Sequence, residues 1–175
     1  MIKAGVIGHP IAHSKSPLIH GYWINQYGID GEYKAYDIDP AELEFGVRRL
    51  VEAGLVGFNV TLPHKQNIMT LCKTLSDEAR LIGAVNTITV LKNGDLHGHN
   101  TDAFGFAQNL KVAVPDFDWK NATATVIGAG GDARAVLYAL QHHGVPAIRI
   151  TNRTRESAEQ LAALYDARVV DWDDR

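Results

Sequence analysis

The stretch TATVIGAGGDARAVLYAL, residues 123–140, decides the fold of this chain. A short apolar run of strand length leads into glycines, and apolar residues at helical spacing follow them. Residues 128–133 fit the pattern G-x-G-x-x-A, in which the first glycine permits a tight turn and the second lets backbone approach a pyrophosphate. The small sixth residue lets the helix pack on the strand. The stretch predicts a dinucleotide-binding strand–turn–helix unit, and an ordinary glycine turn is the alternative.

The predicted cofactor site has two parts. The amides of a glycine-rich loop would meet the phosphates, and this loop consists of Gly128, Ala129, Gly130, Gly131, Asp132 and Ala133. The segment after the next strand holds Asn152, Arg153, Thr154 and Arg155. An NAD site normally carries Asp or Glu there for the ribose 2′-hydroxyl, whereas a guanidinium suits a 2′-phosphate. The sequence therefore favours NADP, with a solvated loop of incidental arginines as the alternative.

Outward from this unit, strand-length apolar runs alternate with helical patterns, which indicates an α/β fold with mainly parallel sheets. The predicted strands cover residues 2–7, 33–38, 56–60, 123–127, 147–150 and 168–170, and the predicted helices cover residues 16–27, 41–52, 133–143 and 156–164. The exception is the segment 87–99, where Asn93-Gly94 predicts a hairpin with a type I′ turn.

A change of composition over residues 109–124, which include Pro115, marks a domain boundary. We expect a first domain over residues 1–103, an open, mainly parallel α/β domain. The second, over residues 104–175, is then a Rossmann-like dinucleotide-binding domain that holds only its first half, with the helix near residues 103–110 as the bridge.

Composition narrows the class of protein. The chain has 175 residues, 46% of them hydrophobic and 21% charged, with a formal net charge of −3. This predicts a soluble globular protein without the basic surface that nucleic-acid binding needs and without a stretch long enough to span a membrane. Without such a basic surface, we expect a small-molecule partner. The single Cys72 excludes an internal disulfide, so we expect a cytoplasmic protein.

Polar side chains follow the strands of the first domain, where ligands of open α/β sheets bind. The candidate ligand-binding residues are Ser14, Ser16, Asn59, Thr61 and Asn86, and the candidate charged pair is Lys65 with Asp102. Hydroxyls, amides and one lysine predict a pocket for a polyol, and hydroxyls before a helix can hold a carboxylate. The alternatives are helix N-caps for the serines and Asp102, and a solvated surface lysine for Lys65. The histidines in these loops show no zinc-binding spacing, so no metal is expected.

Six motifs in order resemble the shikimate dehydrogenase family, which reduces 3-dehydroshikimate to shikimate with NADPH. These are GHPIAHSKSPLIH, FNVTLPHK, GAVNT, GHNTDAFGF, GAGGDARAV and NRT, and the match extends from about residue 5 to residue 165. The resemblance implies a substrate domain followed by a dinucleotide-binding domain.

The resemblance also implies roles for the candidate residues. Ser14 and Ser16 are similar to the serines that bind the substrate carboxylate, and Thr61 and Asn86 to residues that bind ring hydroxyls. Lys65 with Asp102 resembles the catalytic pair.

Two departures from the family pattern stand out. A basic residue commonly follows the NRT motif at the place that Ser157 holds here, while Arg155 stands directly after the motif. Family members also continue beyond the third strand of the dinucleotide domain, which leaves one edge of the strand over residues 123–127 unpaired here. We therefore expect either a piece of a longer enzyme or an edge that another copy covers, in a monomer or a homodimer.

The rival functions are a catalytically silent module that binds shikimate-like acids, and a relative that oxidises quinate or shikimate with NAD.

Overall fold

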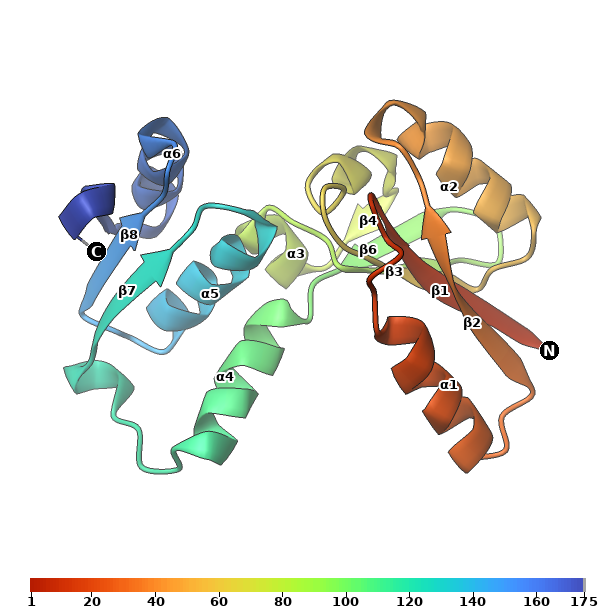
Figure 1. Ribbon diagram of the computed structural model, residues 1–175, viewed down its shortest axis with the longest axis horizontal. Coiled ribbons are helices and arrows are strands. Elements are labelled where there is room, and N and C mark those ends of the chain that lie inside the picture. The colour runs from red at the N-terminus through yellow and green to blue at the C-terminus, as the bar shows by residue number, and fades with distance from the viewer. Residues whose placement is uncertain (175) are drawn as a thin grey trace. The chain divides into compact units, whose positions relative to one another are not determined.

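The computed structural model describes residues 1–174, and the chain forms two compact units, Met1–Asn100 and Thr101–Arg175 (Figure 1). Each unit has its own sheet and its own cluster of buried apolar side chains. The α/β fold class predicted from the sequence is confirmed, with a mixed sheet in the first unit and a short parallel sheet in the second.

The first unit is built on a six-stranded sheet in the order β2-β1-β3-β5-β6-β4. Its strands are β1 (Ile2–Gly8), β2 (Gly31–Asp37), β3 (Gly57–Val60), β4 (Thr74–Leu75), β5 (Thr87–Val90) and β6 (Leu96–His99). β1 pairs in parallel with β2 and β3, so the carboxyl ends of these three strands lie at the same edge of the sheet. β5 is antiparallel to both β3 and β6.

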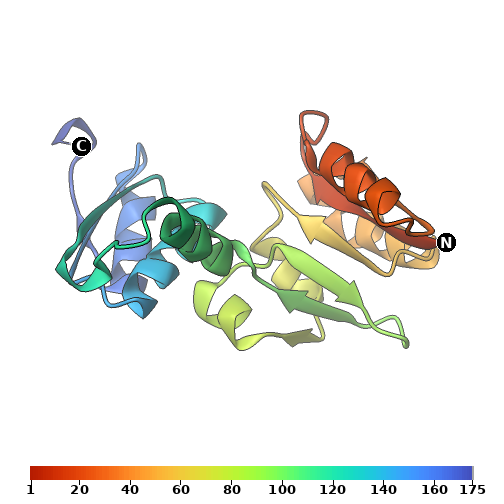
Figure 2. The ribbon, with the colours of Figure 1, turned by 90° about the horizontal axis from the view of Figure 1, so that it is seen from below.

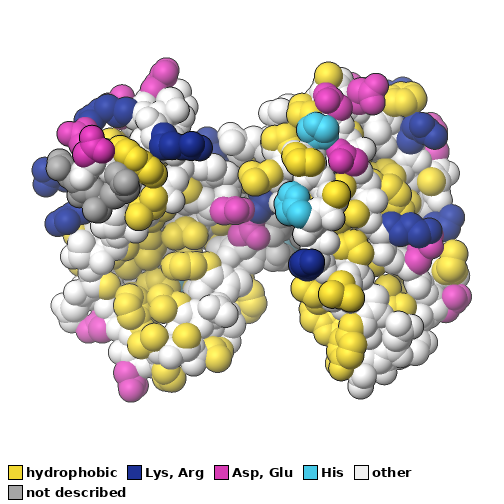
Figure 3. Space-filling view, viewed as in Figure 1, with side chains coloured by type: hydrophobic (Ala, Val, Ile, Leu, Met, Phe, Trp, Pro, Cys, Tyr) yellow, Lys and Arg dark blue, Asp and Glu magenta, His cyan; other side chains and the backbone are white. Residues whose placement is uncertain are grey.

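Helices cover both faces of this sheet. They are α1 (Ser16–Gln26), α2 (Leu43–Glu52) and α3 (Asp77–Ile82), with 3-10 turns at Pro40–Glu42 and Asn67–Leu71. α1 and α2 lie on opposite sides of the strands (Figures 1 and 2). α2 buries Leu43, Val47 and Leu50 in the core of the unit, together with Phe58 and Val60 of β3. α1 buries no residue, and its exposed apolar side chains show in Figure 3.

The hairpin between β5 and β6 confirms the predicted pairing but not the predicted turn. A type I′ turn needs positive φ at both central residues, yet in this turn only Gly94, at φ +85°, has a positive φ. Gly94 N donates to Leu91 O at 2.9 Å, and Leu91 N donates to Asp95 O at 2.8 Å. This is a longer loop that closes on a glycine bulge, because one extra residue stands in the connection.

The second unit is built on a parallel three-stranded sheet in the order β7-β8-β9. Its strands are β7 (Thr123–Ile127), β8 (Ala147–Thr151) and β9 (Arg168–Val169), and its helices are α4 (Asp102–Ala113), α5 (Gly131–His142) and α6 (Arg155–Tyr165). Short 3-10 turns lie at Trp119–Asn121 and Trp172–Asp174. Among the described residues β7 pairs only with β8, so its other edge is open. None of the helices described in residues 1–174 combines the length and the hydropathy needed to cross a bilayer.

Candidate functional site

The loops that follow β1, β2 and β3 are tied to one another at the carboxyl edge of the first sheet. Ile38 N donates to Gly8 O at 3.1 Å, and His9 N donates to Leu62 O at 2.9 Å. Thr61 N donates to Ile7 O at 3.0 Å. The loop that carries the two serines and the loop that carries Thr61 and Lys65 are therefore held by backbone bonds as one polar surface.

A chain of polar side chains crosses β2, β3 and β5 on the face of the sheet that α1 covers. The Tyr33 hydroxyl donates to Asn59 Oδ1 at 2.7 Å, and Asn59 Nδ2 donates to Thr87 Oγ1 at 3.2 Å. The Thr87 hydroxyl donates to Asn86 Oδ1 at 2.8 Å. The structure thus brings together Asn59 and Asn86, both candidates from the sequence. It adds two residues that were not predicted, Tyr33, which belongs to no motif, and Thr87, which follows Asn86 in the motif GAVNT.

Neither serine stands at the N-cap position of α1. Ser16 is the first residue of α1, and the N-cap residue, Lys15, makes no side-chain cap bond. Ser16 N donates to Ser14 Oγ at 3.3 Å, and the Ser16 side chain hydrogen-bonds to Tyr33. Burial raises the pKa of Tyr33 to about 12, and the bond from Ser16 offsets this only in part. The serine pair is therefore continuous with the polar chain described above.

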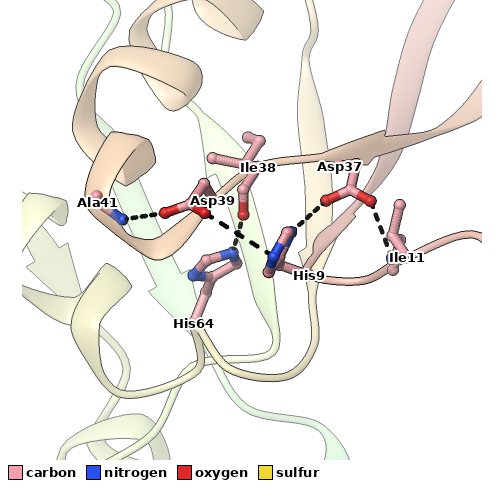
Figure 4. Close-up of polar contacts among 7 residues, drawn as sticks. All are labelled: His9, Ile11, Asp37, Ile38, Asp39, Ala41 and His64. Atoms are coloured by element: carbon pink, nitrogen blue, oxygen red, sulfur yellow. Dashed lines mark hydrogen bonds and ion pairs between the residues drawn. The ribbon is translucent and has the colours of Figure 1, made fainter.

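Lys65 is buried, with 8% of its surface exposed, so the alternative of a solvated surface lysine is wrong. Its carbonyl accepts from Val85 N at 2.7 Å, which ties the lysine loop to the residue before Asn86. The neighbouring His64 is fully buried, and its Nε2 lies 2.8 Å from Ile38 O (Figure 4). Since a carbonyl only accepts, this nitrogen carries the hydrogen.

A second histidine contacts the same end of β2 from the serine loop. His9 Nδ1 lies 2.6 Å from Asp37 Oδ1, and His9 Nε2 lies 3.9 Å from Asp39 Oδ2 (Figure 4). The bond to Asp37 raises the pKa of His9 and lowers the pKa of Asp37. Asp37 Oδ2 also accepts from Ile11 N at 3.4 Å, so one carboxylate fixes two residues of the serine loop.

Asp102 stands at the start of the second unit. It is the first residue of α4, and the N-cap position is held by Thr101, so the alternative of an Asp102 N-cap is wrong. A carboxylate in the first turn of a helix also interacts favourably with the helix dipole. The pairing of Asp102 with Lys65 stays a prediction.

The glycine-rich loop follows β7 and opens α5 as the sequence predicts. Gly128 has φ +114°, a region that other residues rarely adopt, which explains the first glycine. Gly130 has φ −85°, and a Cβ built on it would meet no atom of the described residues within 4 Å, its chain neighbours and its own helix backbone aside. The protein itself therefore does not require a glycine at position 130. A phosphate that approaches the backbone at this position does require a residue without a side chain, so the loop fits a dinucleotide.

The segment after β8 lines a pocket of about 380 Å³ with the end of β9. The polar residues of its lining are Asn152, Arg153, Arg155, Asp171 and Asp173. Arg155 is held by Asp171 and by Glu159, the latter at 2.8 Å from its Nε. Arg153 makes no ion pair with the described residues. The two predicted clamp arginines therefore differ in their surroundings, and Arg153 is the cation available to an added anion.

The family described as "Shikimate dehydrogenase substrate binding domain" matches residues 6–88, and the family described as "Shikimate / quinate 5-dehydrogenase" matches residues 111–174. The chain belongs to the shikimate dehydrogenase family. Among curated relatives, the shikimate dehydrogenase (NADP(+)) of Ruegeria sp. (strain TM1040) is 48% identical over 171 residues, 97% of this chain and 62% of the relative.

Solved structures of shikimate dehydrogenases share the fold. The enzyme from Thermus thermophilus, in complex with NADP(H) and shikimate, has a TM-score of 0.87 and 38% identity over 97% of this chain and 63% of that one. The enzyme from Aquifex aeolicus has a TM-score of 0.90 and 39% identity over 97% of this chain and 62% of that one. The chain thus spans less than two thirds of the length of these shikimate dehydrogenases.

Proposed function

We propose that this protein takes part in the reversible, NADPH-dependent reduction of 3-dehydroshikimate to shikimate. The observation that carries the proposal is the buried Lys65, whose loop is tied to the polar chain of Asn59 and Asn86 on a unit of the shikimate dehydrogenase family. In the proposal residues 1–103 bind the substrate and residues 104–175 bind the dinucleotide. A cytoplasmic location and a monomeric or homodimeric state belong to the proposal as well.

The first unit supplies the groups that such a substrate needs. Ser14 and Ser16 stand at the start of α1, where hydroxyls and helix amides together can hold a carboxylate. Asn59, Thr61 and Asn86 present amide and hydroxyl groups for the ring hydroxyls. The partial burial of this edge strengthens each of these polar contacts, because water competes less well there.

Lys65 is the proposed acid. Reduction of the ring ketone to an alcohol consumes a hydride and a proton, and negative charge develops on the ketone oxygen as the hydride arrives. An ammonium held at that oxygen stabilises the charge and delivers the proton, whereas a guanidinium could not release one. Asp102 would orient the lysine and accept a hydrogen bond from the same hydroxyl.

The second unit would hold the dinucleotide, whose reduced nicotinamide supplies the hydride. The loop after β7 leads into the start of α5 at Gly131, where an anion is favoured by the helix dipole. Arg153 would meet the 2′-phosphate, with Asn152 and Thr154 beside it.

The test is turnover of shikimate with NADP⁺ by this chain, followed by the absorbance of the reduced nicotinamide. We expect Lys65→Ala to lower kcat about 10²- to 10⁴-fold, the usual contribution of a positioned acid or base, while shikimate binding by calorimetry persists. Lys73→Ala is the matched control, since Lys73 is an exposed lysine of the same unit. Near-normal turnover in Lys65→Ala would refute the role of the lysine.

Two rival functions give different results in the same assay. A module that only binds shikimate-like acids would bind shikimate in calorimetry without any turnover. A quinate enzyme would prefer quinate and NAD, and the presence of both Ser14 and Ser16 disfavours it.

A further inference from the structure

Tyr33 lies at the centre of the polar chain on the face of the sheet toward α1. Its phenol oxygen is 2.7 Å from Asn59 Oδ1, and the Ser16 side chain bonds to it as well. His20 of α1 stacks on the ring, with centroids 3.9 Å apart and planes 6° from parallel. Tyr33 therefore joins the proposed carboxylate end of the site, at Ser16, to the proposed hydroxyl end, at Asn59.

The hydrogen bonds beyond Asn59 fix the orientation of its amide. Thr87 donates its only hydroxyl hydrogen to Asn86 Oδ1, so Thr87 Oγ1 must accept the hydrogen bond from Asn59 Nδ2. The backbone oxygen of Asn86, at 3.4 Å from Asn59 Nδ2, can only accept. Both neighbours therefore require the NH₂ group of Asn59 on their side, and its oxygen must face Tyr33.

Only one direction of the hydrogen bond between Tyr33 and Asn59 is compatible with this orientation of the amide. Asn59 Oδ1 has no hydrogen, so the Tyr33 hydroxyl donates to it. The raised pKa of Tyr33, about 12, keeps the phenol protonated at neutral pH. A ligand carboxylate that competes for the hydroxyl of Ser16 leaves the bond from Tyr33 to Asn59 intact, because that bond uses the hydrogen of Tyr33.

We propose that Tyr33 is a positioning residue that, together with Thr87 and the backbone oxygen of Asn86, holds Asn59 as a hydrogen-bond acceptor toward the substrate. Both hydrogens of Asn59 Nδ2 face protein oxygens, and Tyr33 occupies one of the two lone pairs of Oδ1, so the second lone pair remains for a ligand hydroxyl. The site therefore selects a hydroxyl that donates at this position and disfavours a ketone or ether oxygen there. This inference rests on the proposed function, in which Asn59 contacts the substrate.

The experiment compares Tyr33→Phe, which removes one hydroxyl and keeps the ring on His20, with Tyr36→Phe on the same strand. Tyr36 packs against the core on the other side of the sheet, and its hydroxyl makes no hydrogen bond within the described residues. We expect Tyr33→Phe to raise the KM for shikimate about three- to tenfold, the worth of one hydrogen bond, with kcat changed by less than about twofold. Tyr36→Phe should leave both constants unchanged.

A ligand-free readout separates this inference from the proposed function. The side-chain NH₂ signals of Asn59, assigned by their loss in Asn59→Asp, should shift in Tyr33→Phe and not in Tyr36→Phe, since only the former removes the hydrogen bond that Asn59 Oδ1 accepts. Unchanged NH₂ signals in Tyr33→Phe would overturn the inference. If the wild type turns over shikimate, an unchanged KM in Tyr33→Phe would overturn it as well. A wild type that neither turns over nor binds shikimate would refute the proposed function, while the NH₂ signals would still decide whether Tyr33 fixes the amide.

Discussion

The imidazole of His64 donates through Nε2 to the backbone oxygen of Ile38, at 2.8 Å, from a fully buried position next to Lys65. The bond joins the loop after β3 to the end of β2, two strands that do not pair with each other. Nδ1 of the same ring has no hydrogen-bond partner among the described residues. The single donated bond is therefore what the ring contributes beyond its packing.

This bond predicts a difference between two variants of His64. His64→Leu leaves the carbonyl of Ile38 buried without a donor and should lower the free energy of unfolding by about 1–3 kcal/mol, the cost of an unsatisfied buried group. His64→Gln can place an amide nitrogen near the position of Nε2 and should be less destabilising. Urea unfolding followed by circular dichroism measures both, and equal losses would show that the bond contributes nothing.

The His9–Asp37 pair predicts a pH-dependent stability. Because the pKa of His9 is raised above 6.5, its contribution is fully present below pH 6.5 and is lost as the pH rises through the raised value. Because the pKa of Asp37 is lowered below 3.8, its contribution is present above pH 3.8 and is lost as the pH falls through the lowered value. The pair therefore stabilises most between these two values.

We expect His9→Gln to destabilise the protein more at about pH 5.5 than at about pH 8.5, as measured by urea unfolding. His97→Gln serves as the control, since His97 bonds to the hydroxyl of Thr74, at 2.8 Å, and not to a carboxylate. In NMR titrations, Asp37→Asn should bring the pKa of His9 back toward 6.5. An equal destabilisation by His9→Gln at both pH values would contradict the prediction.

The two clamp arginines should contribute unequally to the binding of NADPH. Arg155 is already engaged by Asp171 and Glu159, whereas Arg153 makes no ion pair with the described residues. Arg153→Gln should weaken NADPH binding about 10- to 100-fold, since hydrogen bonds to charged groups contribute about 1.5–3 kcal/mol, and should leave NADH binding nearly unchanged. Fluorescence titration of each reduced dinucleotide measures this. A larger loss in Arg155→Gln would reverse the assignment.

Two glycines of the same loop should respond differently to alanine. Gly130→Ala adds a methyl group that meets none of the described residues within 4 Å, at a φ that alanine adopts freely, so stability should stay unchanged while dinucleotide affinity falls about tenfold or more. Gly128→Ala forces alanine to φ +114° and should destabilise the second unit by about 1–3 kcal/mol. Thermal unfolding and dinucleotide titration separate the two effects, and a destabilised Gly130→Ala protein would remove the argument for a phosphate at this glycine.

Much of the fold could be predicted because its signals are local. The run Thr123–Ile127, the glycines after it and the helical spacing that follows predicted β7, the loop and α5 with bounds close to those observed. The short elements β4 and α3 were missed, because two paired residues and a helix of under two turns leave no periodic pattern. The predicted turn type at Asn93-Gly94 was wrong, because the pairing of Val90 with Leu96, and not the dipeptide, sets the length of the loop.

The sequence by itself determined the family, the glycine that needs positive φ and the residue types that reach the end of each strand, because these depend on backbone stereochemistry and on short-range order. Only the tertiary structure decided which side chains form hydrogen bonds with one another. Tyr33 joins Asn59 from a strand 26 residues away, and the register Asn59↔Thr87 sets the next link of the chain. A hydrogen bond depends on distances of a few tenths of an ångström between residues far apart in the chain, and only the packed sheet fixes such distances.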